Sequence, residues 1–460
     1  MSTFGMLERT RAKEFYELLV ERLGVDAWTE RKSAYMKCIR DKESHFNINL
    51  PIENQIFTPS DDDINWYILA SYLAYDFPYS DIAFSGRRIL TYAMAIGSVA
   101  EKLRRVPNVN SVLDKMLANN NKPETQIFEL LTAAFYLKND YDVSFIPENS
   151  VLWPDGNRKS PDLLVKSGKS EFYVECKRSD KQTKYSRIEQ DAWDIIWTKL
   201  SERMLKFAPW KVIDLTFHDQ VTNVPSEDVI RAAELIIKAN GELVTTESIS
   251  GKLRAIDKMA LKRHYKKYLV SPNSAQQQLL IFGDIDSNEK RSTATIARQV
   301  VKCGAISDVL NFYIKDIAHC VGAQWRCDHA SSISARSKHF KSLINDGVSQ
   351  IPPDRPGIVH VWYETRDGIA VEEMRREKNI HNISNYDASQ STVMGVLVHS
   401  VNYYPREKNF QWAETVQEFA RLPGLLSVYP KQSLMLGGDG GGEIEGTTHW
   451  AQDKAAKATE

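Results

Sequence analysis

Two carboxylates and a lysine lie close together in the segment S-P-D-L-L-V-K-S-G-K-S-E-F-Y-V-E-C-K, which ends at Lys177. Asp162 follows a proline, and Glu175 stands two residues before the lysine. Hydrolysis of a phosphodiester requires an activated water and stabilised charge on the phosphoryl oxygens, and a hard divalent cation supplies both. Mg²⁺ takes oxygen ligands and keeps several waters, so two carboxylates and the backbone carbonyl of Cys176 suffice to hold it. The lysine would orient the attacking water, help it lose a proton, or offset negative charge in the transition state, and the sequence leaves these roles open.

The spacing of these residues predicts a β-hairpin. A short apolar run follows Asp162, and Gly168 can adopt the positive φ that a tight turn requires. Residues 171–177 alternate apolar and polar side chains, which predicts a strand with one face in a core. Glu175 and Lys177 then share a face, and we expect Asp162 to approach Glu175 across the hairpin.

A strongly apolar helix is predicted before the hairpin. Pro123 suits its first turn, and its apolar residues continue to Leu137. Glu129 stands inside this apolar run, where an unpaired buried carboxylate would be costly. Glu129 therefore points into a cleft, binds a cation, or forms an ion pair with a basic side chain, and the sequence leaves these alternatives open.

The hairpin motif resembles that of the PD-(D/E)xK nuclease superfamily, between Pro123 and Arg187. The matching residues are Pro161, Asp162, Glu175 and Lys177. The resemblance implies an α/β fold whose restriction-endonuclease-like core is a central mixed sheet flanked by helices. The implied catalytic residues are Glu129, Asp162, Glu175 and Lys177, and the implied metal ligands are Asp162, Glu175 and the Cys176 carbonyl. The implied cofactor is Mg²⁺, for which Mn²⁺ can substitute.

The implied activity is that of a metal-dependent endonuclease that hydrolyses phosphodiester bonds of DNA. Stand-alone members with extra helical domains resemble bacterial restriction or anti-phage defence effectors, so a partner protein of a defence system is one expectation. A homo-oligomer is another, because duplex cleavage often uses two active sites. Gln190 is followed four residues later by Asp194, not by the Tyr of exonuclease-like members. The alternative is a catalytically silent nuclease-like fold that acts as a nucleic-acid-binding or assembly protein.

Basic side chains surround the motif and predict contacts with a phosphate backbone. Such contacts provide affinity but little sequence choice. The alternative is an ordinary solvated surface. The candidate nucleic-acid contacts are Lys166, Lys169, Arg178, Lys181 and Lys184.

Composition limits the other classes of protein. Of the 460 residues, 42% are hydrophobic and 26% are charged, as is usual for a globular protein. The net charge of −1 excludes a global basic field, so any nucleic-acid surface must be local. Five cysteines form no regular framework, and those near His319 and His329 fit no common zinc spacing. We expect a cytoplasmic protein with no membrane segment.

The chain divides at the polar stretch 119–123, and we expect its second half to complete the central sheet. Apolar strands are predicted over 357–363 and 393–400, and a further strand over 278–282. The predicted organisation is a mainly helical N-terminal domain over 1–119, a nuclease-like domain over 120–430 with a helical insertion around 220–345, and a disordered Gly-rich tail over 437–460.

Overall fold

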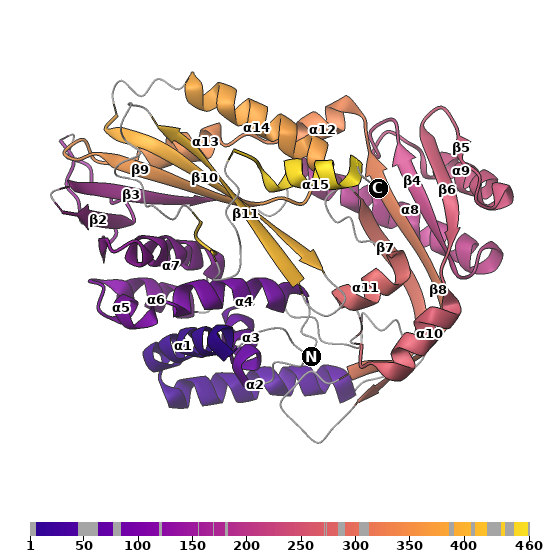
Figure 1. Ribbon diagram of the computed structural model, residues 1–460, viewed down its shortest axis with the longest axis horizontal. Helices are drawn as coiled ribbons and strands as arrows, with labels where there is room; N and C mark the ends of the chain where they lie inside the picture. The colour runs from indigo at the N-terminus through magenta and orange to yellow at the C-terminus, as the bar shows by residue number, and fades with distance from the viewer. Residues whose placement is uncertain are drawn as a thin grey trace.

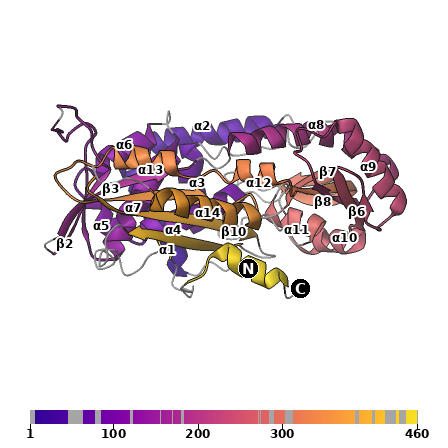
Figure 2. The same cartoon turned by 90° about the horizontal axis from the view of Figure 1, so that it is seen from above.

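The computed structural model contains two β-sheets that lie end to end along the molecule (Figures 1 and 2). Both are flanked by helices, which confirms the predicted α/β class with mixed sheets. The structure describes residues 6–44, 63–76, 84–118, 122–154, 156–168, 170–179, 183–270, 272, 274–283, 290–302, 312–385, 391–405, 410–420, 434–437 and 446–458.

The larger sheet has six strands in the order β1-β2-β3-β9-β10-β11. β9 runs parallel to both β3 and β10, and the other neighbours are antiparallel. The expectation that the second half of the chain completes this sheet is therefore confirmed. The strands are β1 (Asp142–Phe145), β2 (Leu163–Ser167), β3 (Ser170–Arg178), β9 (Gly357–Glu364), β10 (Val393–Pro405) and β11 (Phe410–Ala420).

Helices cover both faces of the six-stranded sheet, as Figure 1 shows. One face packs against α7 (Pro123–Lys138), whose apolar residues share a core with the N-terminal helices. The sheet and the N-terminal helices are thus one packed body and not separately cored domains. The N-terminal helices are α1 (Met6–Leu23), α2 (Val25–Ser44), α3 (Ile64–Asp76), α4 (Phe84–Gly97), α5 (Ala100–Arg104) and α6 (Val109–Leu117).

The opposite face of this sheet is covered by helices from later in the chain. Phe340 and Ile344 pack on Val359 and Val361 of β9. The helices on this side are α12 (Ala330–Arg336), α13 (Lys341–Val348) and α14 (Ile369–Ser384). A short non-helical stretch separates α12 from α13.

The segment between β3 and β9 contains a second sheet, in the order β5-β6-β4-β8-β7. The insertion predicted around 220–345 is therefore not purely helical. It is an α/β unit. Its strands are β4 (Lys211–Phe217), β5 (Val244–Thr245), β6 (Ile249–Ala255), β7 (Arg291–Lys302) and β8 (Phe312–Cys327). Helices α8 (Lys184–Phe207) and α9 (Ser226–Ala239) pack on one face, and α10 (Lys258–Lys267) and α11 (Ala275–Phe282) on the other.

Two local predictions are wrong. Residues 278–282 are helical in α11 and not a strand. The tail predicted to be disordered over 437–460 includes α15 (His449–Ala458), whose first two residues, His449 and Trp450, are buried. None of the described helices is long and apolar enough to cross a bilayer.

We expect the docking of α15 to weaken in acid. The His449 ring makes hydrogen bonds to the hydroxyls of Thr365, at 2.9 Å, and Thr415, at 2.8 Å. Burial lowers the pKa of His449 to about 3, against about 6.5 for an exposed histidine. Between these values the undocked ring binds a proton that the docked ring does not, so docking is stable above pH 6.5 and is lost as the pH falls.

Amide hydrogen exchange tests this expectation. Protection of α15 should fall by up to about tenfold per pH unit below pH 6, with α9 as the internal reference. A His449→Gln variant should lose this pH dependence because it has no titrating ring. Constant protection of α15 from neutral pH to about pH 4 in the wild type would contradict the assignment.

Candidate active site

The open end of the β2–β3 hairpin brings the predicted aspartate and glutamate together. Leu163 pairs with Val174, so the next residues along the two chains, Asp162 and Glu175, face each other. Oδ2 of Asp162 accepts a hydrogen bond from the Cys176 amide at 2.7 Å. The N–H and C=O of one strand residue point to the same side, so the Cys176 carbonyl also faces this edge. Two carboxylates and one carbonyl therefore converge where β2 ends.

The glutamate and lysine of the motif form a close pair. Nζ of Lys177 lies 2.7 Å from Oε1 of Glu175, whose side chain is 2% exposed. With its amide oriented to suit both neighbours, Gln350 donates to Glu175 Oε1 and accepts from Lys177 Nζ, each at 2.9 Å. The second oxygen of the glutamate, Oε2, is buried and has no hydrogen-bond partner within the described residues.

Glu129 on α7 lies within electrostatic reach of the same two carboxylates. Its pKa is raised well above the usual value by burial and then by the charge of Asp162, with a smaller contribution from Glu175. Burial also raises the pKa of Asp162 to about 6, against the opposing effects of the Cys176 amide and Lys177. Burial and the neighbouring Asp162 raise the pKa of Glu175 to about 8. The three carboxylates thus act on one another electrostatically, and Lys177 and Lys115 oppose their repulsion, an arrangement that favours a further cation.

A hard divalent cation fits this donor set in part. In the described portion of the chain, no three His, Cys, Asp or Glu side chains already stand as a metal-binding group. Mg²⁺, however, is commonly held by one or two carboxylates with waters in the remaining positions. Two oxygen atoms of that kind are present: Oε2 of Glu175, which has no hydrogen-bond partner within the described residues, and the carbonyl oxygen of Cys176. The residues that would hold the ion are Asp162, Glu175 and the Cys176 carbonyl.

The predicted nucleic-acid contacts occupy different places. Lys166 is at the far end of the hairpin, 2.8 Å from Glu171. Arg178 is 15% exposed and forms an ion pair with Glu124 of α7, so its charge is engaged inside the protein. Lys184 is exposed at the start of α8. Lys169 and Lys181 lie outside the described residues.

Two side chains at the site carry no sequence signal. Gln350 follows α13, far along the chain from Lys177, and reaches the motif because β9 pairs with β3. Lys115 of α6 acts on the pKa values of Glu129 and Asp162, which it lowers. Neither residue stands in a recognisable motif, so long-range packing alone assigns them to the site.

Comparison with protein-family models, curated proteins and solved structures gives no match for this chain. A functional assignment therefore depends on the geometry and chemistry of the site.

Proposed function

We propose that this protein is a Mg²⁺-dependent nuclease that hydrolyses phosphodiester bonds of DNA. The observation that supports the proposal most is the meeting of Asp162, Glu175 and Lys177 at one edge of the sheet, with Asp162 hydrogen-bonded to the Cys176 amide. The order of elements, α7 followed by the antiparallel strands β1, β2 and β3, is the order expected for a restriction-endonuclease-like core of the PD-(D/E)xK type. A bacterial restriction or anti-phage role agrees with this activity.

Each site residue has a task in this proposal. Bound Mg²⁺ would supply Lewis acidity and a water of lowered pKa. Asp162 and Glu175 provide the negative charge that holds the ion, and Lys177 offsets charge that develops on the phosphoryl oxygens. Gln350 bridges the glutamate and the lysine and so fixes their relative orientation. Glu129, which interacts electrostatically with Asp162, is assigned to orienting water in the site.

Calorimetric titration with Mg²⁺ and Mn²⁺ tests the metal site. We expect the wild type to bind one ion per site and Asp162→Ala to bind it at least about tenfold more weakly, because a principal ligand is lost. Asp142→Ala is the matched control, since Asp142 is exposed on β1 in the same sheet. That control should bind as the wild type does.

Two outcomes would count against the proposal. Equal affinity of the wild type and Asp162→Ala would place the ion elsewhere. Absence of binding in both proteins would favour the alternative, a catalytically silent nuclease-like fold that binds nucleic acid or takes part in an assembly.

A further inference from the structure

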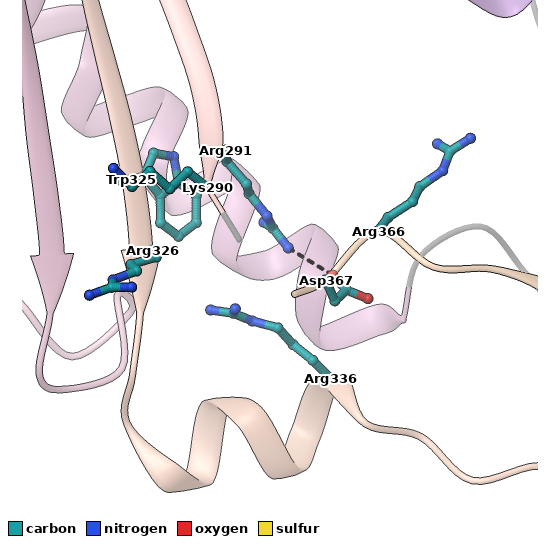
Figure 3. Close-up of a pocket in the computed structure, with 7 residues that line it drawn as sticks. All are labelled: Lys290, Arg291, Trp325, Arg326, Arg336, Arg366 and Asp367. Atoms are coloured by element: carbon teal, nitrogen blue, oxygen red, sulfur yellow. Dashed lines mark hydrogen bonds and ion pairs between the residues drawn. The ribbon is translucent and has the colours of Figure 1, made fainter. Parts of the chain in front are cut away.

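A strongly basic pocket lies where the two sheets meet (Figure 3). Its enclosed volume is only about 10 Å³, and the rest of the space between these side chains is open to solvent. Five cationic side chains and one carboxylate line it: Lys290, Arg291, Arg326, Arg336, Arg366 and Asp367. Lys290, Arg291 and Arg326 belong to the second sheet or to the residue directly before it. The other three belong to α12 and to the loop after β9. Both units of the molecule are therefore needed to form the pocket.

The inner wall of the pocket consists of arginines held in place by buried carboxylates. Arg336 is 6% exposed and makes two hydrogen bonds to Glu189, at 2.7 and 2.8 Å. Arg291 donates to the carbonyl of Ser186 at 3.1 Å and lies 3.4 Å from Asp367. Its guanidinium also lies over the ring of Trp325, 5.0 Å from the ring centre. These contacts fix both guanidinium groups before any ligand arrives, which reduces the entropy cost of binding.

The outer wall adds positive charge. Lys290 is 33% exposed and lies 3.9 Å from Asp214, and the exposed Arg326 donates to the hydroxyl of Thr216. In Figure 3 Arg366 extends away from the other side chains, so we leave it out of the binding set. Burial, and then the charge of Arg336, lower the pKa of Arg291, although Asp367 opposes this. The pocket thus has an excess of positive charge that an anion would balance.

The pocket and the candidate active site lie at the same end of the larger sheet. Lys177 pairs in register with Val361 on the parallel strand β9, and Asp367 stands six residues further along that chain. An extended chain spans at most about 3.5 Å per residue and neighbouring strands lie about 4.8 Å apart, so the backbone positions of Lys177 and Asp367 are within about 26 Å of each other. Phosphates recur every 3.4 Å or so along each strand of a duplex, so one strand can reach both sites.

We propose that this pocket binds a backbone phosphate of the nucleic-acid strand that is cleaved, a few nucleotides from the scissile bond. Lys290 and Arg326 provide positive charge at the rim of the pocket, and Arg291 and Arg336, held by Asp367 and Glu189, form the basic wall behind them. The inference rests on the proposed nuclease function. It adds a fixed second contact, which would set the position of the strand relative to Asp162 and Glu175 and give the inserted unit a role in substrate binding.

The salt dependence of DNA binding tests the pocket. A Lys290→Gln/Arg326→Gln variant should bind duplex DNA in Ca²⁺, without cleavage, about tenfold more weakly at physiological salt. The slope of log K against log salt should fall by about 1, because the contact with one phosphate is lost. The matched control is Arg263→Gln/Lys266→Gln, which removes two exposed charges from α10 of the same unit and should leave the slope unchanged. Arg291→Lys keeps the charge but removes the fork, and it should also weaken binding.

The results separate the pocket from the nuclease activity. An unchanged slope in the Lys290/Arg326 variant, or an equal loss in the α10 control, would overturn the pocket proposal even if the wild type cleaves DNA. If inorganic phosphate binds the wild type by calorimetry while the variant keeps full DNA affinity, the assignment to a nucleic-acid strand is overturned. If the wild type does not cleave DNA but the variant shows a smaller salt dependence of DNA binding, the nuclease function fails and the phosphate site is supported.

Discussion

Replacement of Lys177 by alanine is expected to lower Mg²⁺-dependent nicking of plasmid DNA by about 10³-fold. The Lys177 ammonium is the cation closest to the paired carboxylates, 2.7 Å from Glu175, and it would lie beside the phosphoryl group under attack. A charge fixed in a partly buried site stabilises a transition state far more than a charge in water does. The measurement is the rate of conversion of supercoiled to open-circular plasmid under single-turnover conditions.

Two further variants show whether the loss is specific. Lys166→Ala removes a lysine from the same hairpin but from its far end, where it pairs with Glu171, and should leave the rate nearly unchanged. Lys177→Met keeps the aliphatic stem, which lies close to Gly347 of α13, and so separates the loss of charge from a packing defect. Full cleavage by a folded Lys177→Met protein would contradict the mechanism, because the motif has no other lysine that could replace the charge of Lys177.

The hairpin could be predicted because its information is local. Gly168 adopts a φ of +57°, and the alternating residues after it place Glu175 and Lys177 on one face of β3. The pairing of Leu163 with Val174 then follows from the turn, and it brings Asp162 opposite Glu175. Neighbours in sequence determine each of these contacts, so no knowledge of the rest of the chain was required.

The parts that were missed depend on weaker or longer-range signals. A short run such as 278–282, in which four apolar residues follow Gln278, shows no clear period, so it suits a strand or a helix equally. The helix start is marked by Ser274, whose hydroxyl accepts from the Gln277 amide at 3.1 Å. Similarly, Thr448 accepts from the Ala451 amide and begins α15 after a Gly-rich segment that obscured it. Capping residues were the local evidence that could have corrected both predictions.

The site as a whole was beyond local reasoning because β3 and β9 are joined across the inserted unit. Parallel pairing of strands separated by so long a connection leaves no short-range trace in sequence. Gln350 reaches Glu175 and Lys177 only through this pairing, and Arg178 faces Glu124 only because α7 packs along β3. The chemistry was therefore readable from the motif, but its supporting side chains came from the tertiary fold.

One buried ion-pair network couples the N-terminal helices to the catalytic strand, and its loss should have the largest effect on stability. Arg88 of α4 is 1% exposed and contacts Glu124 and, at 2.7 Å, Glu364 at the end of β9. Glu124 also contacts Arg178, the residue after Lys177. Burial would raise the pKa of Glu364, but Arg366 and Arg88 hold it far below its usual range. The carboxylate of Glu364 thus remains ionised inside the protein only because the arginines accompany it.

Arg88→Met is therefore expected to lower the free energy of unfolding by about 3–5 kcal/mol, because it leaves two buried carboxylates short of a cation. Urea denaturation measures the loss. Arg104→Met is the matched control: Arg104 pairs with Glu21 and Glu14 at the surface of the same helical layer and should cost less than about 1 kcal/mol. Equal losses in the two variants would show that Arg88 does not hold β3 and β9 to the helices. With Arg178 displaced, the orientation of Lys177 should also suffer, so nicking by the folded fraction of Arg88→Met should fall, whereas Arg104→Met should cleave normally.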